Sequence, residues 1–152
     1  MIEQRLTELG IILPEAASPS FNYVPVTLHR GLAHVAGQLP KVDGEVRVQG
    51  KAGGAVSLET ARSEARICIL QGLACLKQAL ETLDRIERVL KVTGFVASAP
   101  GFNDQPKGLD AASDLLAEIL GEAGRHARSA VGVAELPRNA SVEIEMIVAY
   151  RE

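Results

Sequence analysis

Charged residues in the last third of the sequence are the first candidates for chemistry. His126 and Arg128 stand just before an apolar run at 130–134, and Glu143 and Glu145 alternate with apolar residues further on. An arginine at the start of a strand that is otherwise suited to burial could pair with one of these carboxylates. On spacing alone, the simpler interpretation is an arginine that solvates the strand end and two glutamates on a charged outer sheet face.

The order of these segments suggests a hairpin. Residues 128–137 and 142–147 both resemble strands, and only the short sequence RNAS separates them. We therefore expect the two strands to be neighbours in the sheet. In such a hairpin Arg128 lies level with the far half of the last strand. A pair between Arg128 and Glu143 is therefore not assured within one chain and could also form across a subunit boundary.

The last strand has two unlike faces. Alternation places one apolar set toward the helices, namely Val142, Ile144, Met146 and Val148. The other set begins with charged residues and ends with apolar ones, namely Ser141, Glu143, Glu145, Ile147 and Ala149. Because a strand face in water is usually polar along its length, the mixed face predicts cover by a second subunit.

Two helices are predicted to pack beside these strands. Residues 58–83 carry an apolar residue at every third or fourth position, and Ser57 is a suitable N-cap. A second helix is predicted to start near Pro106 and to end near Gly121 or Gly124. Both patterns are amphipathic, so both helices are expected to lie on a sheet.

Strand-like runs precede and separate the helices. Residues 23–40 suggest an antiparallel hairpin that turns near Gly31, and residues 86–98 are rich in β-branched side chains. The order of elements predicts an α+β fold in which two helices cover one face of a mixed sheet. We expect a single domain over 1–152, in which residues 1–17 add an N-terminal helix and a connector.

Composition and charge exclude several classes of function. The chain has 152 residues, 47% of them hydrophobic, and a formal net charge of −3. Nucleic-acid binders usually carry a basic patch, and aromatic residues for base stacking make up only 3% here, so nucleic acid is not an expected partner. No apolar run approaches the roughly 20 residues of a membrane span, and no secretory signal is evident. We therefore expect a cytoplasmic protein that does not bind membranes.

Metal and thiol chemistry find little support. His29, His34 and His126 lack the spacing of metal ligands on one element. Cys68 and Cys75 are too far apart along a helix to form a disulfide and are expected to be small buried side chains. No metal site is predicted.

The C-terminal stretch ARSAVGVAELPRNASVEIEMIVAY resembles the signature of the RidA/YjgF family, the reactive-intermediate enamine/imine deaminases. That family was earlier labelled L-PSP endoribonucleases or translation inhibitors. Upstream, VAGQLP at 35–40 resembles the family's Ser-Gly-Gln-Ile-Pro stretch. Tyr23 precedes Gly37 by the interval that separates the family's pocket tyrosine from its Gly-Gln pair. With the order of elements, the resemblance covers nearly all of 18–150.

This resemblance implies a chorismate-mutase-like α+β fold assembled as a homotrimer, with pockets between subunits. Arg128 would hold the carboxylate of a 2-imino acid or its enamine, because a planar guanidinium matches a carboxylate at two points. Glu143 matches the acidic residue that positions and activates water, which would release ammonia and leave a 2-keto acid. Tyr23, Gly37 and Ala130 would contact the substrate. The resemblance implies neither a metal nor an organic cofactor.

Departures from the family pattern keep other functions open. Ala130 stands where many members carry a cysteine, and Ala36 replaces a common serine before Gly37. Besides the deaminase, we consider a non-catalytic small-carboxylate-binding protein or metabolic sensor that uses the same pocket. The sequence does not separate these two, because both need Arg128. An endoribonuclease or translation inhibitor is disfavoured by the negative charge and the scarcity of aromatic residues.

Overall fold

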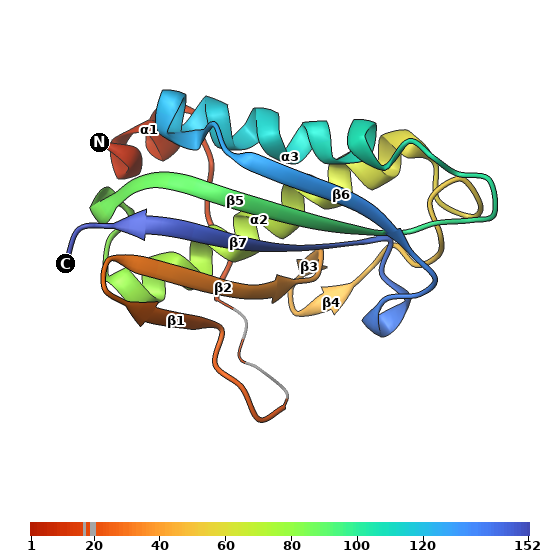
Figure 1. Cartoon of the computed structure of the whole chain (residues 1–152), viewed down its shortest axis with the longest axis horizontal. Helices are drawn as coiled ribbons and strands as arrows, with labels where there is room; N and C mark the ends of the chain where they lie inside the picture. Colours follow the sequence, from red (N-terminus) through yellow and green to blue (C-terminus); the bar gives the residue numbers. More distant parts are fainter. Residues whose placement is uncertain (17, 19–20) are drawn as a thin grey trace.

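The computed structural model describes residues 1–16, 18 and 21–152, so residues 17, 19 and 20 of the predicted connector lie outside the described chain (Figure 1). The helices are α1 (Ile2–Glu8), α2 (Leu58–Leu80) and α3 (Gln105–Leu120). The strands are β1 (Val26–His29), β2 (Leu32–Gln38), β3 (Lys41–Val42), β4 (Glu45–Val46), β5 (Ile86–Ala97), β6 (Ala127–Val133) and β7 (Val142–Tyr150). Short 3₁₀ turns lie at Leu83–Arg85, Gly121–Gly124 and Pro137–Asn139.

Five strands form one mixed sheet in the order β1, β2, β7, β5, β6. Neighbouring strands are antiparallel except β5 and β6, which run parallel. The two short strands β3 and β4 pair separately. α2 and α3 pack on the same face of the large sheet (Figure 1). The predicted α+β fold, with two helices on one face of a mixed sheet, is confirmed.

The prediction that the last two strands are neighbours is wrong. β6 pairs with β5, and β7 lies between β2 and β5, so β5 separates the two strands that we expected to form a hairpin. The cause is α3, because a strand–helix–strand connection brings β6 back parallel to β5 at the sheet edge. The segment 134–141 then crosses the end of β5 to start β7 in the middle of the sheet.

α2 begins and lies where its sequence predicts. The Ser57 hydroxyl accepts a hydrogen bond from the Thr60 backbone N–H at 3.1 Å, which caps the helix. The helix ends at Leu80, three residues before the predicted end, because Glu81 takes a left-handed conformation with φ of 69°. A Cβ on Gly72 would lie 2.5 Å from Met146 Cε, so this glycine lets the helix approach β7 closely.

The two cysteines are buried on α2, as expected from their place in the apolar stripe. No disulfide joins them. The apolar stripe of α2 also carries two buried polar residues that its pattern did not indicate, Glu64 and Gln71. The Gln71 amide donates to the Lys41 backbone carbonyl at 2.9 Å and so holds β3 against the helix.

α3 follows the predicted pattern of start and stop residues. Pro106 stands in its first turn, and Gly121 ends it with φ of 62°. Its inward side chains are buried in the common core, namely Leu109, Ala112, Leu115, Leu116 and Ile119. The opposite side of the helix is exposed or half-buried and runs beside β6 (Figure 1).

β7 has the two faces that alternation predicts. The helix-facing set, Val142, Ile144, Met146 and Val148, is buried. On the other face Glu145 is exposed, while Glu143, Ile147 and Ala149 are half-buried. Among the described residues no helix lies over this second face, which we call the open face of the sheet.

The hairpins also follow their turn residues. β1 and β2 are joined by Arg30 and Gly31, both with positive φ, and β1 is an edge strand that starts directly after Pro25. Asp43 and Gly44 join β3 to β4 in the same way. Only Leu39 and Pro40 separate the end of β2 from the start of β3, and the candidate site lies at this junction.

Candidate functional site

β7 holds Glu143 on the open face of the sheet. Its cross-strand neighbour on β5 is Phe95, and the buried Val142 and Ile144 flank it along the strand. Burial raises the pKa of the Glu143 carboxyl group, and the nearby charge of Glu145 raises that pKa further. A carboxyl group with a raised pKa exchanges its proton closer to neutral pH, which suits a general base.

Gly37 makes room for this carboxylate. The register between β2 and β7 shifts between Val35 and Gln38, and this irregularity turns Gly37 toward Glu143. A Cβ on Gly37 would lie 2.2 Å from Glu143 Oε1, far inside any allowed contact. The glycine is therefore what allows the Glu143 carboxylate to occupy its position.

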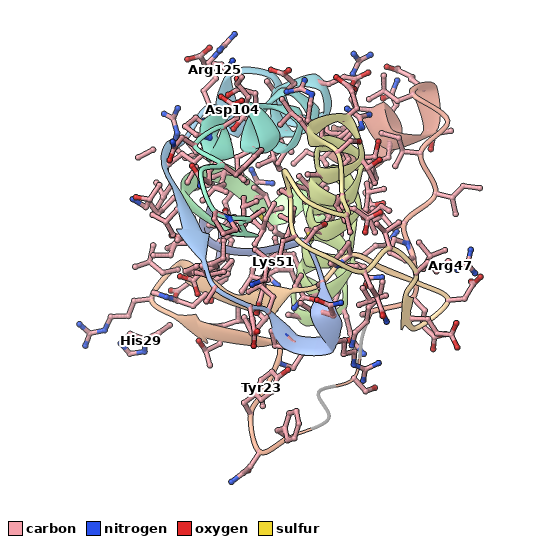
Figure 2. All side chains as sticks on the ribbon, turned by 90° about the vertical axis from the view of Figure 1, so that its right-hand side faces the viewer. Tyr23, His29, Arg47, Lys51, Asp104 and Arg125 are labelled. Carbon is pink, nitrogen blue, oxygen red and sulfur yellow. The ribbon has the colours of Figure 1, made fainter. Side chains whose placement is uncertain are left out.

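Glu143 and Gly37 line a cavity of about 310 Å³, which we call the Glu143 cavity. Tyr23, half exposed on the loop before β1, lines the same cavity (Figure 2). Two cations, Lys41 and Arg138, line it as well. The remaining lining residues are Ser18, Phe21, Pro25, Ala36, Gln38, Leu39 and Pro137. Three of the sequence-predicted site residues thus lie around one cavity.

Arg128 lies on the other side of the sheet, beside α3. It pairs in register with Val92, whose side chain is buried under the helices. Its guanidinium donates from Nη1 to Asp110 Oδ1 and Ser113 Oγ, both at 3.0 Å, and from Nη2 to the Pro106 carbonyl at 3.2 Å. These residues come from α3, so the helix fixes the orientation of the guanidinium.

Arg128 keeps part of its hydrogen-bonding capacity. An arginine has five N–H donors, and the three bonds to α3 use both donors of Nη1 and one of Nη2. Neither Nε–H nor the second donor of Nη2 has a partner among the described residues. Two N–H donors, one on Nε and one on Nη2, therefore remain available to an acceptor such as a carboxylate.

A short chain of hydrogen bonds extends from Arg128 through Ser113 to His126. His126 Nδ1 lies 2.6 Å from the Gly124 carbonyl and must donate to it, so neutral His126 Nε2 accepts from the Ser113 hydroxyl at 2.9 Å. Ser113 Oγ in turn accepts from Arg128. Burial lowers the pKa of His126, the Gly124 bond opposes this, and the Arg128 charge lowers the pKa further. His126 is therefore held neutral where it orients Ser113.

A groove of about 750 Å³ lies over this network. Its lining residues come from α3 and from the chain that leads into β6, namely Asp110, Ser113, Asp114, Ala117, Glu118, Arg125, His126 and Arg128. The Arg128 side chain lines this groove and is 19% exposed. Ala130, two residues further along β6, is half-buried and packs against the core.

The structure divides the predicted site residues into two groups. Tyr23, Gly37 and Glu143 share the Glu143 cavity, whereas Arg128 and Ala130 lie on β6 at the far edge of the sheet. Arg128 faces the helix side and Glu143 the open side, with β5 between them. The two groups do not meet within one chain.

Several residues of both groups were missed by the sequence analysis. Asp110 and Ser113 gave no signal, because their relation to Arg128 arises only when α3 packs beside β6. Lys41 and Arg138 do have a signal, since each directly follows a Leu-Pro pair at the end of a strand-like run. Such a pair ends a strand and leaves the next side chain at the sheet's edge.

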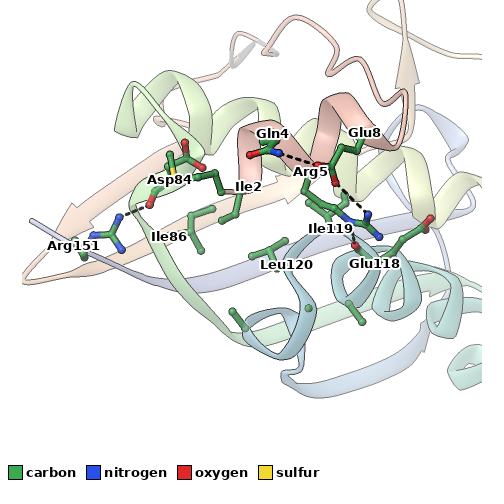
Figure 3. A pocket seen from close by; sticks show the side chains of 14 residues that line it. Ile2, Gln4, Arg5, Glu8, Asp84, Ile86, Glu118, Ile119, Leu120 and Arg151 are labelled. Carbon is green, nitrogen blue, oxygen red and sulfur yellow. Dashed lines mark hydrogen bonds and ion pairs between the residues drawn. The ribbon is translucent and has the colours of Figure 1, made fainter.

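Another large hollow does not contain any predicted site residue. A cavity of about 710 Å³ lies between α1, the end of α3 and the C-terminal residues (Figure 3). Its two arginines have partners nearby: Arg5 donates to the Glu118 backbone carbonyl at 3.1 Å and pairs with the Glu8 carboxylate at 3.5 Å. Arg151 likewise donates to the Asp84 carbonyl. This hollow therefore offers few unsatisfied groups to a ligand.

The described residues contain neither a cluster of metal ligands nor a membrane-spanning helix. No group of three or more His, Cys, Asp or Glu side chains within them is arranged to hold a metal ion. No helix in the described parts of the chain is both long and apolar enough to span a bilayer.

The sheet order and the placement of both helices define a chorismate-mutase-like α+β protein. A family model described as "YjgF/chorismate mutase-like, putative endoribonuclease" matches residues 3–149. The chain belongs to this YjgF/RidA family. The YjgF gene product of E. coli shares the fold, with a TM-score of 0.67 and 24% identity over 90% of this chain and 94% of that one.

More similar proteins cover nearly the whole chain. It is 43% identical to protein TCP17 of Trypanosoma cruzi over 148 residues, 97% of this chain and 92% of that protein. It is 49% identical to the solved structure of Atu1372, a protein with unknown function from Agrobacterium tumefaciens, with a TM-score of 0.91 over 99% of this chain and 92% of that one. Over 64 residues it is 45% identical to a 2-iminobutanoate/2-iminopropanoate deaminase of Dermatophagoides farinae, which is 42% of this chain and 44% of that protein.

Proposed function

We propose that this chain hydrolyses 2-imino acids, or their enamine tautomers, to 2-keto acids and ammonia. The observation that carries the proposal is the division of the site into two complementary parts. Glu143 lies beside Gly37 with a raised pKa, as suits proton transfer, and Arg128 lines a groove with two N–H donors unused by the described residues. Because the two parts do not meet in one chain, the proposal needs a second copy to complete the site.

The proposed assembly is a homotrimer in which the open faces of the sheets meet. That face carries apolar side chains that the single chain leaves accessible, among them Leu32 and Val131, together with half-buried Phe95 and Ile147. Burying such surface is the main source of stability in permanent interfaces. The β6 edge of one copy would then lie next to the Glu143 cavity of its neighbour.

The substrate carboxylate would bind to the unused Nε and Nη2 donors of Arg128 from one subunit, which places the C=N carbon near Glu143 of the next. The imine nitrogen would be protonated at the start. Water attacks the C=N carbon while the Glu143 carboxylate takes a proton from the water, and the C=N electron pair moves to nitrogen. Glu143 then returns this proton to nitrogen, and the C–N bond breaks. The hydroxyl oxygen forms the new C=O bond, and its proton leaves with ammonia as ammonium.

The other residues would bind or orient the substrate. Tyr23, on the rim of the Glu143 cavity, can donate a hydrogen bond from its hydroxyl group. At Ala130 the contact would come from the backbone, because no thiol is present. The named deaminase among the relatives supports the same reaction class, although it matches less than half of this chain.

The test is an assay on 2-iminobutanoate generated in the cuvette by an amino-acid oxidase, read as 2-oxobutanoate formation above the spontaneous rate. We expect the wild-type protein to accelerate hydrolysis. Glu143→Gln should retain the fold and lose about 100-fold or more in kcat, because a positioned general base contributes about 10²–10⁴-fold. Glu87→Gln, exposed near the start of β5, is the matched control, because Glu87 neither lines the cavity nor shifts the pKa of Glu143.

Two results would redirect the proposal. Absence of turnover together with tight binding of 2-oxo acids would make the chain a carboxylate-binding protein. RNA binding that weakens steeply with salt would support the endoribonuclease label of the family description.

A further inference from the structure

The Glu143 cavity contains more positive charge than a monocarboxylic substrate requires. Lys41 and Arg138 both line it, and Glu143 is the one carboxyl group among its lining residues. Neither cation forms an ion pair or a side-chain hydrogen bond within the described chain. With two cations and one carboxyl group, the cavity lining has one more positive group than negative groups, although the whole protein has a net charge of −3.

The backbone fixes both cations at the cavity. Arg138 lies in the turn before β7 with φ of 55°, and Asn139 also has φ of 55°. The left-handed region is costly for a side chain such as that of Arg138. The turn persists because Asn139 N–H donates to the Leu136 carbonyl at 3.1 Å and the Asn139 carbonyl accepts from Gly50 N–H at 2.9 Å.

Lys41 is held at the start of β3. Its carbonyl accepts the Gln71 amide from α2, and its N–H donates to the Leu39 carbonyl at 2.8 Å. Lys41 and Arg138 line the same cavity. Burial lowers the pKa of Lys41, repulsion from Arg138 lowers it further, and Cys75 opposes this. An anion bound between Lys41 and Arg138 would relieve their repulsion.

Charge balance then indicates the substrate class. In the proposed deaminase, Arg128 of the neighbouring copy already binds the carboxylate next to the C=N carbon. We infer that the substrate is a 2-imino dicarboxylic acid and that Lys41 and Arg138 bind its side-chain carboxylate. This inference rests on the proposed function for the reaction but not for the binding, because the cation pair belongs to the chain itself.

The experiment compares two stable product-like ligands by calorimetry on the assembled protein. 2-Oxopentanedioate and 2-oxopentanoate have the same number of carbons and differ in the terminal group, a carboxylate or a methyl. A charged hydrogen bond at a binding site is worth about tenfold or more in affinity. We therefore expect 2-oxopentanedioate to bind at least about tenfold more tightly.

Two variants test whether Lys41 and Arg138 cause the preference for 2-oxopentanedioate. Lys41→Gln and Arg138→Asn should each remove most of it and leave the affinity for 2-oxopentanoate within about twofold. Asparagine tolerates the left-handed conformation at position 138, so Arg138→Asn is expected to fold even if Lys41→Gln disturbs β3. Arg47→Gln removes a cation that pairs with Asp43 and does not line the cavity, so it is the matched control.

Three outcomes would overturn the inference. Equal affinity for the two ligands would remove the dicarboxylate preference. A preference that survives both variants would place the second carboxylate elsewhere. Tighter binding of inorganic phosphate than of either oxo acid, lost in the same variants, would identify a phosphate ligand instead. Because calorimetry needs no turnover, a dicarboxylate preference without imine hydrolysis would refute the deaminase and leave the ligand class standing.

Discussion

At Arg128, the three hydrogen bonds to α3 hold the guanidinium in place and leave two of its five N–H donors unused. Arg128→Lys keeps the charge and loses the planar guanidinium, whereas Arg128→Ala loses both. Losing a charged hydrogen-bonding partner costs about 2–3 kcal/mol, so Arg128→Ala should lower kcat/KM toward imino acids about 30- to 150-fold. In Arg128→Lys, kcat/KM should be higher than in Arg128→Ala but should stay below the wild-type value. The measurement is steady-state kinetics on variants whose thermal melts show that they fold.

Arg125→Ala is the control for this substitution. Arg125 lines the same groove, and its ion pair with Glu122 is exposed. Its loss should leave the rate close to that of the wild type. A folded Arg128→Ala protein with wild-type kinetics would reduce Arg128 to a residue that only solvates a strand end.

Gly37 is a second position where a single substitution tests the proposed role of Glu143. In Gly37→Ala the new methyl group would meet Glu143 Oε1 at 2.2 Å, and the flexible end of the glutamate must move. We expect a folded protein with kcat lowered about 100-fold, because displacing a catalytic group by about 1 Å has that effect. Gly108→Ala, where the nearest atom lies at 3.9 Å, should leave kcat unchanged. Full activity in a folded Gly37→Ala protein would separate Glu143 from catalysis.

At the scale of elements, His126 and Ser113 connect α3 to β6, and this connection depends on pH. The pKa of His126 is lowered in the folded state. Above the ordinary histidine range, near 6.5, folded and unfolded chains are both neutral at this residue, so it costs no stability. As pH falls through that range and then through the folded pKa, the unfolded chain takes up the proton first, and the folded protein loses stability.

His126→Gln tests this linkage. Glutamine stays neutral, so the melting temperature of the wild type relative to this variant should fall as pH is lowered from 8 to 5. Comparing the two proteins cancels the titration of Glu64 and Glu143, whose pKa values are raised by burial in both. A difference in melting temperature that stays constant with pH would show that His126 is not held neutral.

The two long helices could be predicted from the sequence, because the start and the end of a helix depend on residues close by in the chain. Ser57 caps α2 through a bond three residues away, and Pro106 and Gly121 bound α3. Strand order depends on distant pairing. The short link before β7 suggested a hairpin, but α3 packs β6 against β5, and β7 inserts between β5 and β2.

The residues of the candidate site could likewise be predicted only in part. Family resemblance indicated Tyr23, Gly37 and Glu143, and these line one cavity. The contacts of Arg128 with Asp110 and Ser113 span 18 and 15 residues and follow from the packing of α3, which spacing along one strand does not encode. Whether each predicted residue acts on a substrate stays a prediction.

For the whole molecule, the uncovered sheet face and the divided site are the two observations behind the proposed assembly. We predict a homotrimer, so light scattering at micromolar concentration should give about three times the chain mass of 16.1 kDa. Val131→Lys, which puts a charge on the open face, should weaken the assembly, whereas Glu87→Lys, exposed near the start of β5, should not. A stable wild-type monomer would contradict both the assembly and the shared site.

The central claim, that Arg128 of one subunit acts with Glu143 of another, is tested most directly by mixing two inactive variants. Arg128→Ala and Glu143→Gln chains are unfolded, combined in equal amounts and refolded, with each variant refolded alone as the control. In a cyclic trimer of randomly mixed chains, about one quarter of the sites join an intact Glu143 to an intact Arg128. The account predicts recovery of about a quarter of the wild-type deaminase activity in the mixture. Mixed trimers that form but show no activity above the separate variants would contradict it.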